Sequence, residues 1–318
     1  MSPSRKRRSK KRRGRGRKSR EFKPRLKPLT HDFEERLVSA FNAHDKVLWI
    51  YYFPFLYCYG RTSRCSMLYT QTGDSHVLFL EREGSRGRQL DLFVPPIPLT
   101  KESVEFGRRV IGMRRRPRPG RILWVDEQDA AQLRQWGLDP VEREKEYLLN
   151  PKRLVPSDAD LPRRLRRKLR QAEEQELACV PYEDEHREAA YNLVDRLAEE
   201  TPPEMPLLDY DYTVECLGNV RKLTEHGMIA LAALHNGEFA GFAFGGGMTD
   251  RVANFFIIKT DPDVPGLAEW LRMEFLKRVS DYELVNDASD LGLEGLAQHK
   301  RQFMPIRMLP AFTVRDLT

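Results

Sequence analysis

Residues 286–305 constrain this chain most, because they bring an amide, a carboxylate, an ammonium and an aromatic ring to one junction between a strand and a helix. The stretch reads N-D-A-S-D-L-G-L-E-G-L-A-Q-H-K-R-Q-F-M-P. The apolar run 282–285 before it predicts a strand, Leu291-Gly292 predicts a turn, and the helix that follows ends at about residues 300–303, before Pro305. Polar groups at a strand end are where α/β proteins build their sites. The alternative interpretation is a capped helix on the surface.

The order of predicted elements repeats along the chain. The second half predicts helices over 161–175, 186–200 and 212–225, a hairpin across Asn236-Gly237, a strand over 252–258, a helix over 267–279 and a last strand over 306–314. Helices, a strand meander and a closing strand–helix–strand follow one another in the GNAT acyltransferase fold, and residues 31–136 show the same order less clearly. We therefore predict an α/β fold with mixed sheets, as two tandem GNAT-like acyltransferase domains. The alternative is a single mixed sheet with long insertions.

Charge divides the chain into a basic tail and an acidic body. Residues 1–29 hold fifteen of the 54 Lys and Arg and one of the 47 Asp and Glu, which leaves 39 basic and 46 acidic residues in 30–318. The tail has few apolar residues and repels itself, so we expect it to be disordered. We place the domains at residues 1–29 for this tail, 30–145 for the N-terminal unit and 146–318 for the C-terminal unit, which carries the expected site.

The spacing of the cysteines and the hydropathy of the chain indicate the cellular compartment of the protein. Cys58, Cys65, Cys179 and Cys216 show no Cys-x-x-Cys spacing, so no zinc cluster or disulfide framework is indicated, and a reduced, cytoplasmic environment fits. No apolar run reaches the roughly 18–20 residues that span a bilayer. We expect a cytoplasmic protein, with peripheral attachment to an anionic membrane through the basic tail as an alternative.

The pattern N-x-x-x-D-L-G-x-x-G-L-x-x-x-K-x-x-[aromatic]-x-P resembles the C-terminal domain of bacterial phosphatidylglycerol lysyltransferases and their soluble relatives. The segment F-I-I-K-T-D at 256–261, followed by Gly266 and a helix with Glu274, is similar to another part of that family. The resemblance covers about 141–314, and more weakly 31–139. The chain departs from the family at Ser289, where a second acid is common, and at Phe303, where a tyrosine is frequent.

The resemblance implies an acyltransferase or aminoacyltransferase site at the junction. In that interpretation Asp290 holds a cationic amino group or acts as base, and Lys300 or Arg307 stabilises the oxyanion or binds a lipid phosphate. The remaining candidates are the amide of Asn286 and the substrate-binding residues Lys259, Glu274 and Phe303. We expect no metal ligands, and direct transfer without a covalent enzyme intermediate, because no Ser/His/Asp or Cys/His arrangement is recognisable.

The donor is predicted from two further segments. GNAT enzymes hold coenzyme A with a glycine-rich loop before a helix, but residues 259–268 read K-T-D-P-D-V-P-G-L-A, with two prolines and two aspartates that disfavour coenzyme A. A helix with six cations in eight residues instead predicts a surface for an RNA backbone. Its cations are Arg163, Arg164, Arg166, Arg167, Lys168 and Arg170. The alternative is that Glu173, Glu174 and Glu176 neutralise them.

Together these features predict an acyl- or aminoacyltransferase without a bound cofactor. We expect it to take an aminoacyl group from aminoacyl-tRNA and to place it on a lipid headgroup or on a small amine or hydroxyl acceptor. The expected partners are tRNA or another RNA and, through the tail, an anionic membrane surface. Two alternatives remain open: an N-acyltransferase that uses an acyl thioester, and a non-catalytic protein that binds RNA or the ribosome on a GNAT frame.

Overall fold

The computed structural model describes residues 24–84, 87–113, 120–154, 161–202 and 209–317. The basic tail predicted at residues 1–29 lies outside them as far as residue 23. Within the described ranges, no helix is long and apolar enough to cross a membrane.

Ten elements follow one another in the same order in each half of the chain. The first half comprises β1 (Lys27–Pro28), α1 (Glu34–Ala43), α2 (Phe53–Tyr59), β2 (Cys65–Thr72), β3 (Ser75–Gly84), β4 (Gly87–Leu92), α3 (Lys101–Gly112), β5 (Ile122–Val125), α4 (Glu127–Gln135) and β6 (Pro140–Leu149). The second half comprises β7 (Leu177–Pro181), α7 (Arg187–Glu200), α8 (Tyr210–Glu225), β8 (Met228–His235), β9 (Glu238–Gly247), β10 (Val252–Thr260), α9 (Leu267–Arg278), β11 (Leu284–Ser289), α10 (Glu294–Arg301) and β12 (Arg307–Val314). Two further helices, α5 (Pro151–Leu154) and α6 (Arg163–Glu173), connect the halves. The repeated order confirms the predicted fold class.

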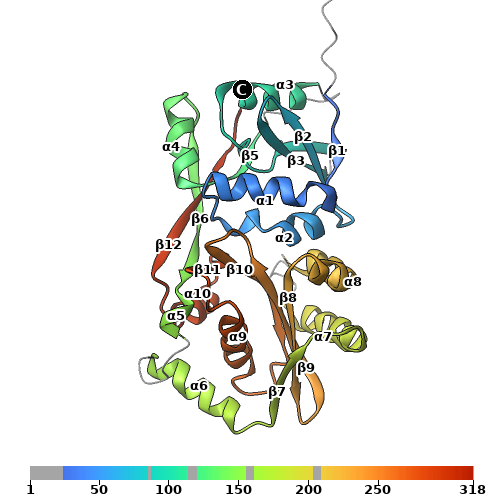
Figure 1. Ribbon diagram of the computed structural model, residues 1–318, viewed down its shortest axis with the longest axis vertical. Helices are drawn as coiled ribbons and strands as arrows, with labels where there is room; N and C mark the ends of the chain where they lie inside the picture. Colours follow the sequence, from blue (N-terminus) through green and yellow to red (C-terminus); the bar gives the residue numbers. More distant parts are fainter. Residues whose placement is uncertain (1–23, 85–86, 114–119, 155–160, 203–208, 318) are drawn as a thin grey trace, which may run out of the picture.

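The twelve strands of the described ranges form one sheet, because the two halves exchange their last strands. The order is β1-β2-β3-β4-β5-β12-β6-β11-β10-β9-β8-β7, so β12 lies beside β5 of the first half and β6 lies beside β11 of the second. Figure 1 shows β6 and β12 running together along one side of the molecule and joining its upper and lower parts. The boundary predicted between residues 145 and 146 falls inside β6, and the division into two domains stays a prediction.

Local sequence signals explain several element ends. Asn236 and Gly237 both adopt positive φ, 52° and 81°, which is the tight turn predicted for the β8–β9 hairpin. Thr100 and Ser103 form a reciprocal capping box at the start of α3. One predicted end was wrong: β11 continues past Val285 to Ser289, through an irregularity at Ala288, whose φ is 54°. The sequence hid this continuation because Asn286 and Asp287 are polar yet buried.

Three hydrophobic clusters stabilise the sheet. One lies in the first half around α3 and β3, and one in the second half around α9 and β10. The largest joins the halves: it combines the aromatic segment of η2 (Trp49–Tyr51) and α2 with α8, and it reaches Leu148 of β6 and Leu309 of β12. The aromatic stretch from Trp49 to Tyr57 is buried there. Burial of this segment between the halves positions the site described below.

We predict that the glycine run at the end of β9 tolerates no side chain at Gly245. A Cβ at Gly245 would overlap the carbonyl oxygen of Asn254 and the ring of Phe275, whereas a Cβ at Gly295, in exposed α10, would meet nothing within 4 Å. Gly245→Ala should therefore lower the free energy of unfolding by about 1–3 kcal/mol. Gly295→Ala, the matched control, should raise it by roughly 0.5–1 kcal/mol through helix propensity. Urea denaturation compares the two, and equal stabilities would contradict the close packing.

Candidate functional site

The site begins where β10 and β11 separate. These parallel strands pair only from Val252 to Asn254, opposite Leu284 to Asn286, and then diverge. The segment that leads into η2, from Val47 to Trp49, enters the gap from the first half of the chain. Trp49 donates its backbone N–H to Glu146 and accepts a hydrogen bond from Asn254 through its carbonyl. The gap between the strands is therefore held open by a segment some 200 residues away in sequence.

A buried hydrogen-bond network fixes this segment. Glu146 Oε2 accepts from the Trp49 N–H at 2.8 Å and from Asn286 Nδ2 at 2.7 Å, and Asn286 Nδ2 also donates to the Val47 carbonyl at 2.8 Å. Asn254 Nδ2 donates to the Trp49 carbonyl at 3.1 Å. Both asparagines are fully buried and Glu146 is 2% exposed. Because a buried polar group is costly without partners, these side chains are held to one geometry.

Burial also changes the acidity of Glu146. Removal from water raises the pKa of its carboxyl from 4.5 to about 7, and the hydrogen bonds from Asn286 and Trp49 offset this only in part. A carboxyl with a pKa near neutrality can both accept and return a proton at physiological pH.

A pocket of about 440 Å³ opens over this network, and both halves of the chain line it. Its aromatic walls are Trp49, Phe55, Tyr59, Trp124, Tyr212 and Phe256. Phe256 is the extra residue of a β-bulge, where the register between β10 and β9 shifts between Phe255 and Ile257. The volume lies within the range of small-molecule sites.

The polar lining of the pocket is mainly acidic. Glu144, Glu146 and Asp209 line it, together with Arg143 and Lys259. Each of the two cations already has a partner: Lys259 Nζ lies 2.7 Å from Asp209, and the Arg143 guanidinium lies 4.2 Å from the centre of the Trp124 ring. Burial raises the pKa of Glu144 as well. Aromatic faces beside carboxylates are a suitable environment for an ammonium group.

The opposite face of β11 carries a separate buried ion cluster. Asp287 pairs with Arg272 of α9, and the Lys300 ammonium of α10 donates to the Asp287 carbonyl and lies 3.7 Å from its carboxylate. The Arg272 guanidinium lies over the rings of Phe255 and Phe303, 4.2 Å and 5.1 Å from their centres. Burial lowers the pKa of Lys300. This cluster joins β11 to the two helices that pack on it.

The structure does not bring the four predicted catalytic residues together. Asn286 lies under the pocket and holds Glu146, whereas Lys300 is buried on the other face of β11. Asp290 follows β11, accepts from Tyr147 Oη at 2.5 Å and binds the Gly292 N–H at 2.9 Å. It does not cap α10, whose N-cap is Leu293. Arg307 is exposed and pairs with Glu127.

The predicted substrate-binding residues are likewise separated in the structure. Lys259 lines the pocket. Phe303 is buried beneath Arg272, and Glu274 pairs with Lys277 on α9. The roles given to all these residues stay predictions.

The predicted cationic helix is α6. Its side chains Arg163, Arg164, Arg167 and Arg170 are exposed, while Leu165 is buried against the core of the second half. Arg164 hydrogen-bonds to Gln298 of α10 at 3.4 Å, and the loop before α10 lines the pocket with Leu291 and Leu293. The basic surface is thus connected to the pocket through α10.

Sequence reasoning missed three residues that shape the site. Trp49 lies in an aromatic run, which by itself indicates packing, and Glu146 lies in the charged run E-R-E-K-E, where nothing marks it. Arg272 had a visible signal, since it interrupts the apolar pattern of α9. A cation inside such a helix indicates a buried ion pair.

The sequence matches the family model described as phosphatidylglycerol lysyltransferase, C-terminal, over residues 49–315. The chain belongs to this family. The match begins at Trp49, the residue that enters the strand gap, and includes the pocket and the ion cluster. Membership places the chain among acyltransferases, as the resemblance predicted. No curated protein matches the sequence.

Solved structures of low sequence identity share the fold. A conserved protein of unknown function from Bacteroides thetaiotaomicron superposes with a TM-score of 0.77 at 16% identity, covering 92% of this chain and 99% of that one. L-PGS from Bacillus licheniformis superposes with a TM-score of 0.63 at 12% identity, covering 88% and 91%. FemX superposes with a TM-score of 0.62 at 8% identity, covering 92% and 96%. At these identities the likeness is one of fold.

We predict that the ion cluster under β11 is essential for stability. Asp287→Ala would leave Arg272 and Lys300 buried without their counter-charge and should cost about 3–5 kcal/mol. Glu283→Ala, which breaks an exposed pair with Arg251, should leave the free energy of unfolding nearly unchanged. Guanidinium denaturation of both variants checks this, and a mild effect of Asp287→Ala would contradict the cluster.

Proposed function

We propose that this family member transfers an aminoacyl group from aminoacyl-tRNA to the hydroxyl or amine of an acceptor such as a lipid headgroup. The observation that carries the proposal is the aromatic and acidic pocket over Glu146. Family membership supports acyl transfer, and the family is described by a lysyl transfer to phosphatidylglycerol. An aminoacyl group differs from other acyl groups by its ammonium, which the acids and aromatic rings of this pocket suit.

The geometry supports a distinct role for each group. The ammonium of the aminoacyl group would lie among Glu144, Asp209 and the ring faces of Trp49 and Tyr212. Glu146 would take the proton from the attacking O–H or N–H of the acceptor. As the acceptor bonds to the carbonyl carbon and the ester C–O bond breaks, Glu146 would return the proton to the departing ribose hydroxyl. Lys259 would stabilise the negative charge that develops on the carbonyl oxygen.

The start of α9 supports a donor other than coenzyme A. The Asp261 carboxylate in the loop from β10 to α9 already has two partners: it accepts from the Asp263 N–H at 3.0 Å and pairs with Arg196 of α7. A Cβ at Gly266, the residue before α9, would overlap the carbonyl oxygen of Lys168 in α6. The helix end that binds pyrophosphate in coenzyme A-dependent relatives is therefore packed closely against α6.

The exposed arginines of α6 would hold the backbone of the tRNA, and the basic tail would add electrostatic attraction to RNA or to anionic lipid. Electrostatic binding of this kind needs exposed cations and no sequence-specific contact. The connection of α6 to the pocket through α10 would bring the acceptor end of a bound tRNA towards Glu146.

We predict that Glu146→Gln abolishes catalysis and preserves the fold. Glutamine keeps an oxygen that accepts from Trp49 and Asn286 but cannot take a proton, so the transfer rate should fall about 10²–10⁴-fold. In the unchanged protein the rate should rise with pH through about 7, as Glu146 loses its proton. Single-turnover transfer of a radiolabelled aminoacyl group across pH 5.5–8.5 measures both.

A stability measurement separates this chemistry from folding. Since the pKa of Glu146 is higher in the folded state, that state binds more protons than the unfolded chain between pH 4.5 and about 7, and stability should fall as pH rises through this window. Glu146→Gln should remove this component. Full transfer activity in a folded Glu146→Gln protein would exclude Glu146 as the base.

We predict that α6 binds RNA through its exposed face. Changing Arg163, Arg167 and Arg170 to Glu should weaken tRNA binding and make the log–log salt dependence shallower, by about 0.7–0.9 for each phosphate that α6 no longer neutralises. The control changes three arginines that are also exposed, Arg108 of α3, Arg221 of α8 and Arg278 of α9, to Glu. The tail is the same in both proteins. An equal fall in affinity in both would show a general charge effect and contradict a site on α6.

A further inference from the structure

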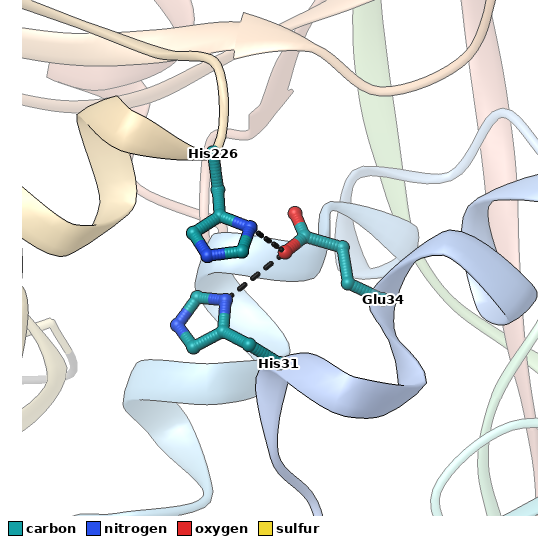
Figure 2. A group of neighbouring side chains, drawn as sticks. All are labelled: His31, Glu34 and His226. Carbon is teal, nitrogen blue, oxygen red and sulfur yellow. Dashed lines mark hydrogen bonds and ion pairs between the residues drawn. The ribbon is translucent and has the colours of Figure 1, made fainter.

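Outside the pocket, two histidines and a glutamate meet at one point between the halves of the chain. Glu34 Oε2 lies 3.0 Å from His31 Nδ1 and 2.9 Å from His226 Nδ1. Figure 2 shows both rings directed at the same carboxylate oxygen. One ligand atom from each residue lies within 4.8 Å of the other two.

The backbone fixes where these three residues lie. His31 begins the 3-10 turn His31–Phe33 that leads into α1, and Glu34 is the first residue of α1. Their spacing of three residues places both side chains on one side of this turn. His226 follows the last residue of α8, and the chain turns away at Gly227, whose φ is 90°. Contacts between α2 and α8 hold the two regions together. The cluster therefore joins elements nearly 200 residues apart in the chain.

The three side chains differ in their access to solvent. That of His31 is 7% exposed and packs against the rings of Phe53 and Tyr57, that of Glu34 is 15% exposed, and that of His226 is 40% exposed. His31 and Glu34 are thus largely buried, and an ion could reach them past the half-exposed ring of His226.

Hydrogen bonding alone leaves this cluster incomplete. Among the residues that the structure describes, His31 Nε2 is buried and has no hydrogen-bond partner. A buried polar ring that is satisfied on one edge only is destabilising. An ion at this point would bind the atoms that face one another, Nδ1 of both histidines and Oε2 of Glu34, and would fix the His31 ring with its proton on Nε2.

The ligand types and spacings fit a zinc ion. Two imidazoles and one carboxylate are a recurrent protein ligand set for Zn²⁺, which takes nitrogen and oxygen at about 2.0–2.2 Å in tetrahedral geometry. Ligand atoms on such a tetrahedron are about 3.3–3.5 Å apart. The two observed N–O distances thus need to open by only a few tenths of an ångström. The third distance, between the two histidine nitrogens, can adjust because the ring of His226 is half-exposed.

We propose that His31, Glu34 and His226 form a zinc site that fastens the start of α1 to the end of α8, with water as the fourth ligand. In the described part of the chain, the residues that line the pocket do not include these three. The site is therefore separate from the pocket, and it acts on α8, whose first turn carries Tyr212 in the pocket wall.

The test is calorimetric titration of Zn²⁺ into the full chain, without a polyhistidine tag, after chelation and with a reductant present. We expect one equivalent to bind saturably and to raise the melting temperature, because a ligand of the folded state alone stabilises it. Co²⁺ in its place should show the intense visible absorption of a tetrahedral site.

Two variants and one control decide the outcome. His226→Ala removes a half-exposed ligand, and Glu34→Gln keeps a hydrogen-bond acceptor but removes the anionic ligand. Each should weaken zinc binding by at least about tenfold and abolish the rise in melting temperature. His44→Ala changes an exposed histidine outside the cluster and should leave both unchanged. Absence of saturable binding, or equal affinity in His226→Ala and His44→Ala, would overturn the site and leave a hydrogen-bonded cluster.

Discussion

The entry of Trp49 between β10 and β11 is the interaction on which the rest of the site depends. Two parallel strands that part in the middle of a sheet leave backbone N–H and C=O groups without partners, which is unfavourable in a buried place. Here the indole N–H of Trp49 donates to the Phe255 carbonyl of β10, and the Asn286 side chain accepts from the Ala288 N–H of β11. The side chains of Glu146 and Asn254 in turn bind the backbone of Trp49. The same network forms the floor of the pocket and buries the Glu146 carboxyl. The separation of the strands and the raised pKa of Glu146 therefore have the same structural origin.

Strand exchange explains how a segment of the first half reaches the second. Because β6 crosses to pair with β11 and β12 crosses to pair with β5, the two repeated units share one sheet and one large core. Glu146 lies on the exchanged strand β6, Trp49 on the first half, and Phe256 and Tyr212 on the second. Neither half contains the pocket alone, and we expect that neither would bind a substrate after separation.

Much of the fold was predictable from sequence because it is encoded locally. The turn at Asn236-Gly237, the amphipathic α6 and the helix after Gly266 each follow from residue types at short spacing. The site was less predictable because its partners are distant: Asn286 and Asp290 are prominent in the sequence, but nothing local indicates that Asn286 meets Trp49 and Glu146 or that Lys300 faces Asp287. Polar residues inside β11 also concealed its true length, since their burial depends on partners from α9, α10 and β6.

The central claim is that the pocket over Glu146 receives the aminoacyl group, and a crystal structure with a non-hydrolysable amide analogue of lysyl-adenosine tests it most directly. The account predicts the ammonium among Glu144, Asp209 and the aromatic walls, with the amide carbonyl between Lys259 and Glu146. An analogue bound elsewhere, with the pocket closed to it or filled by protein side chains, would contradict the account.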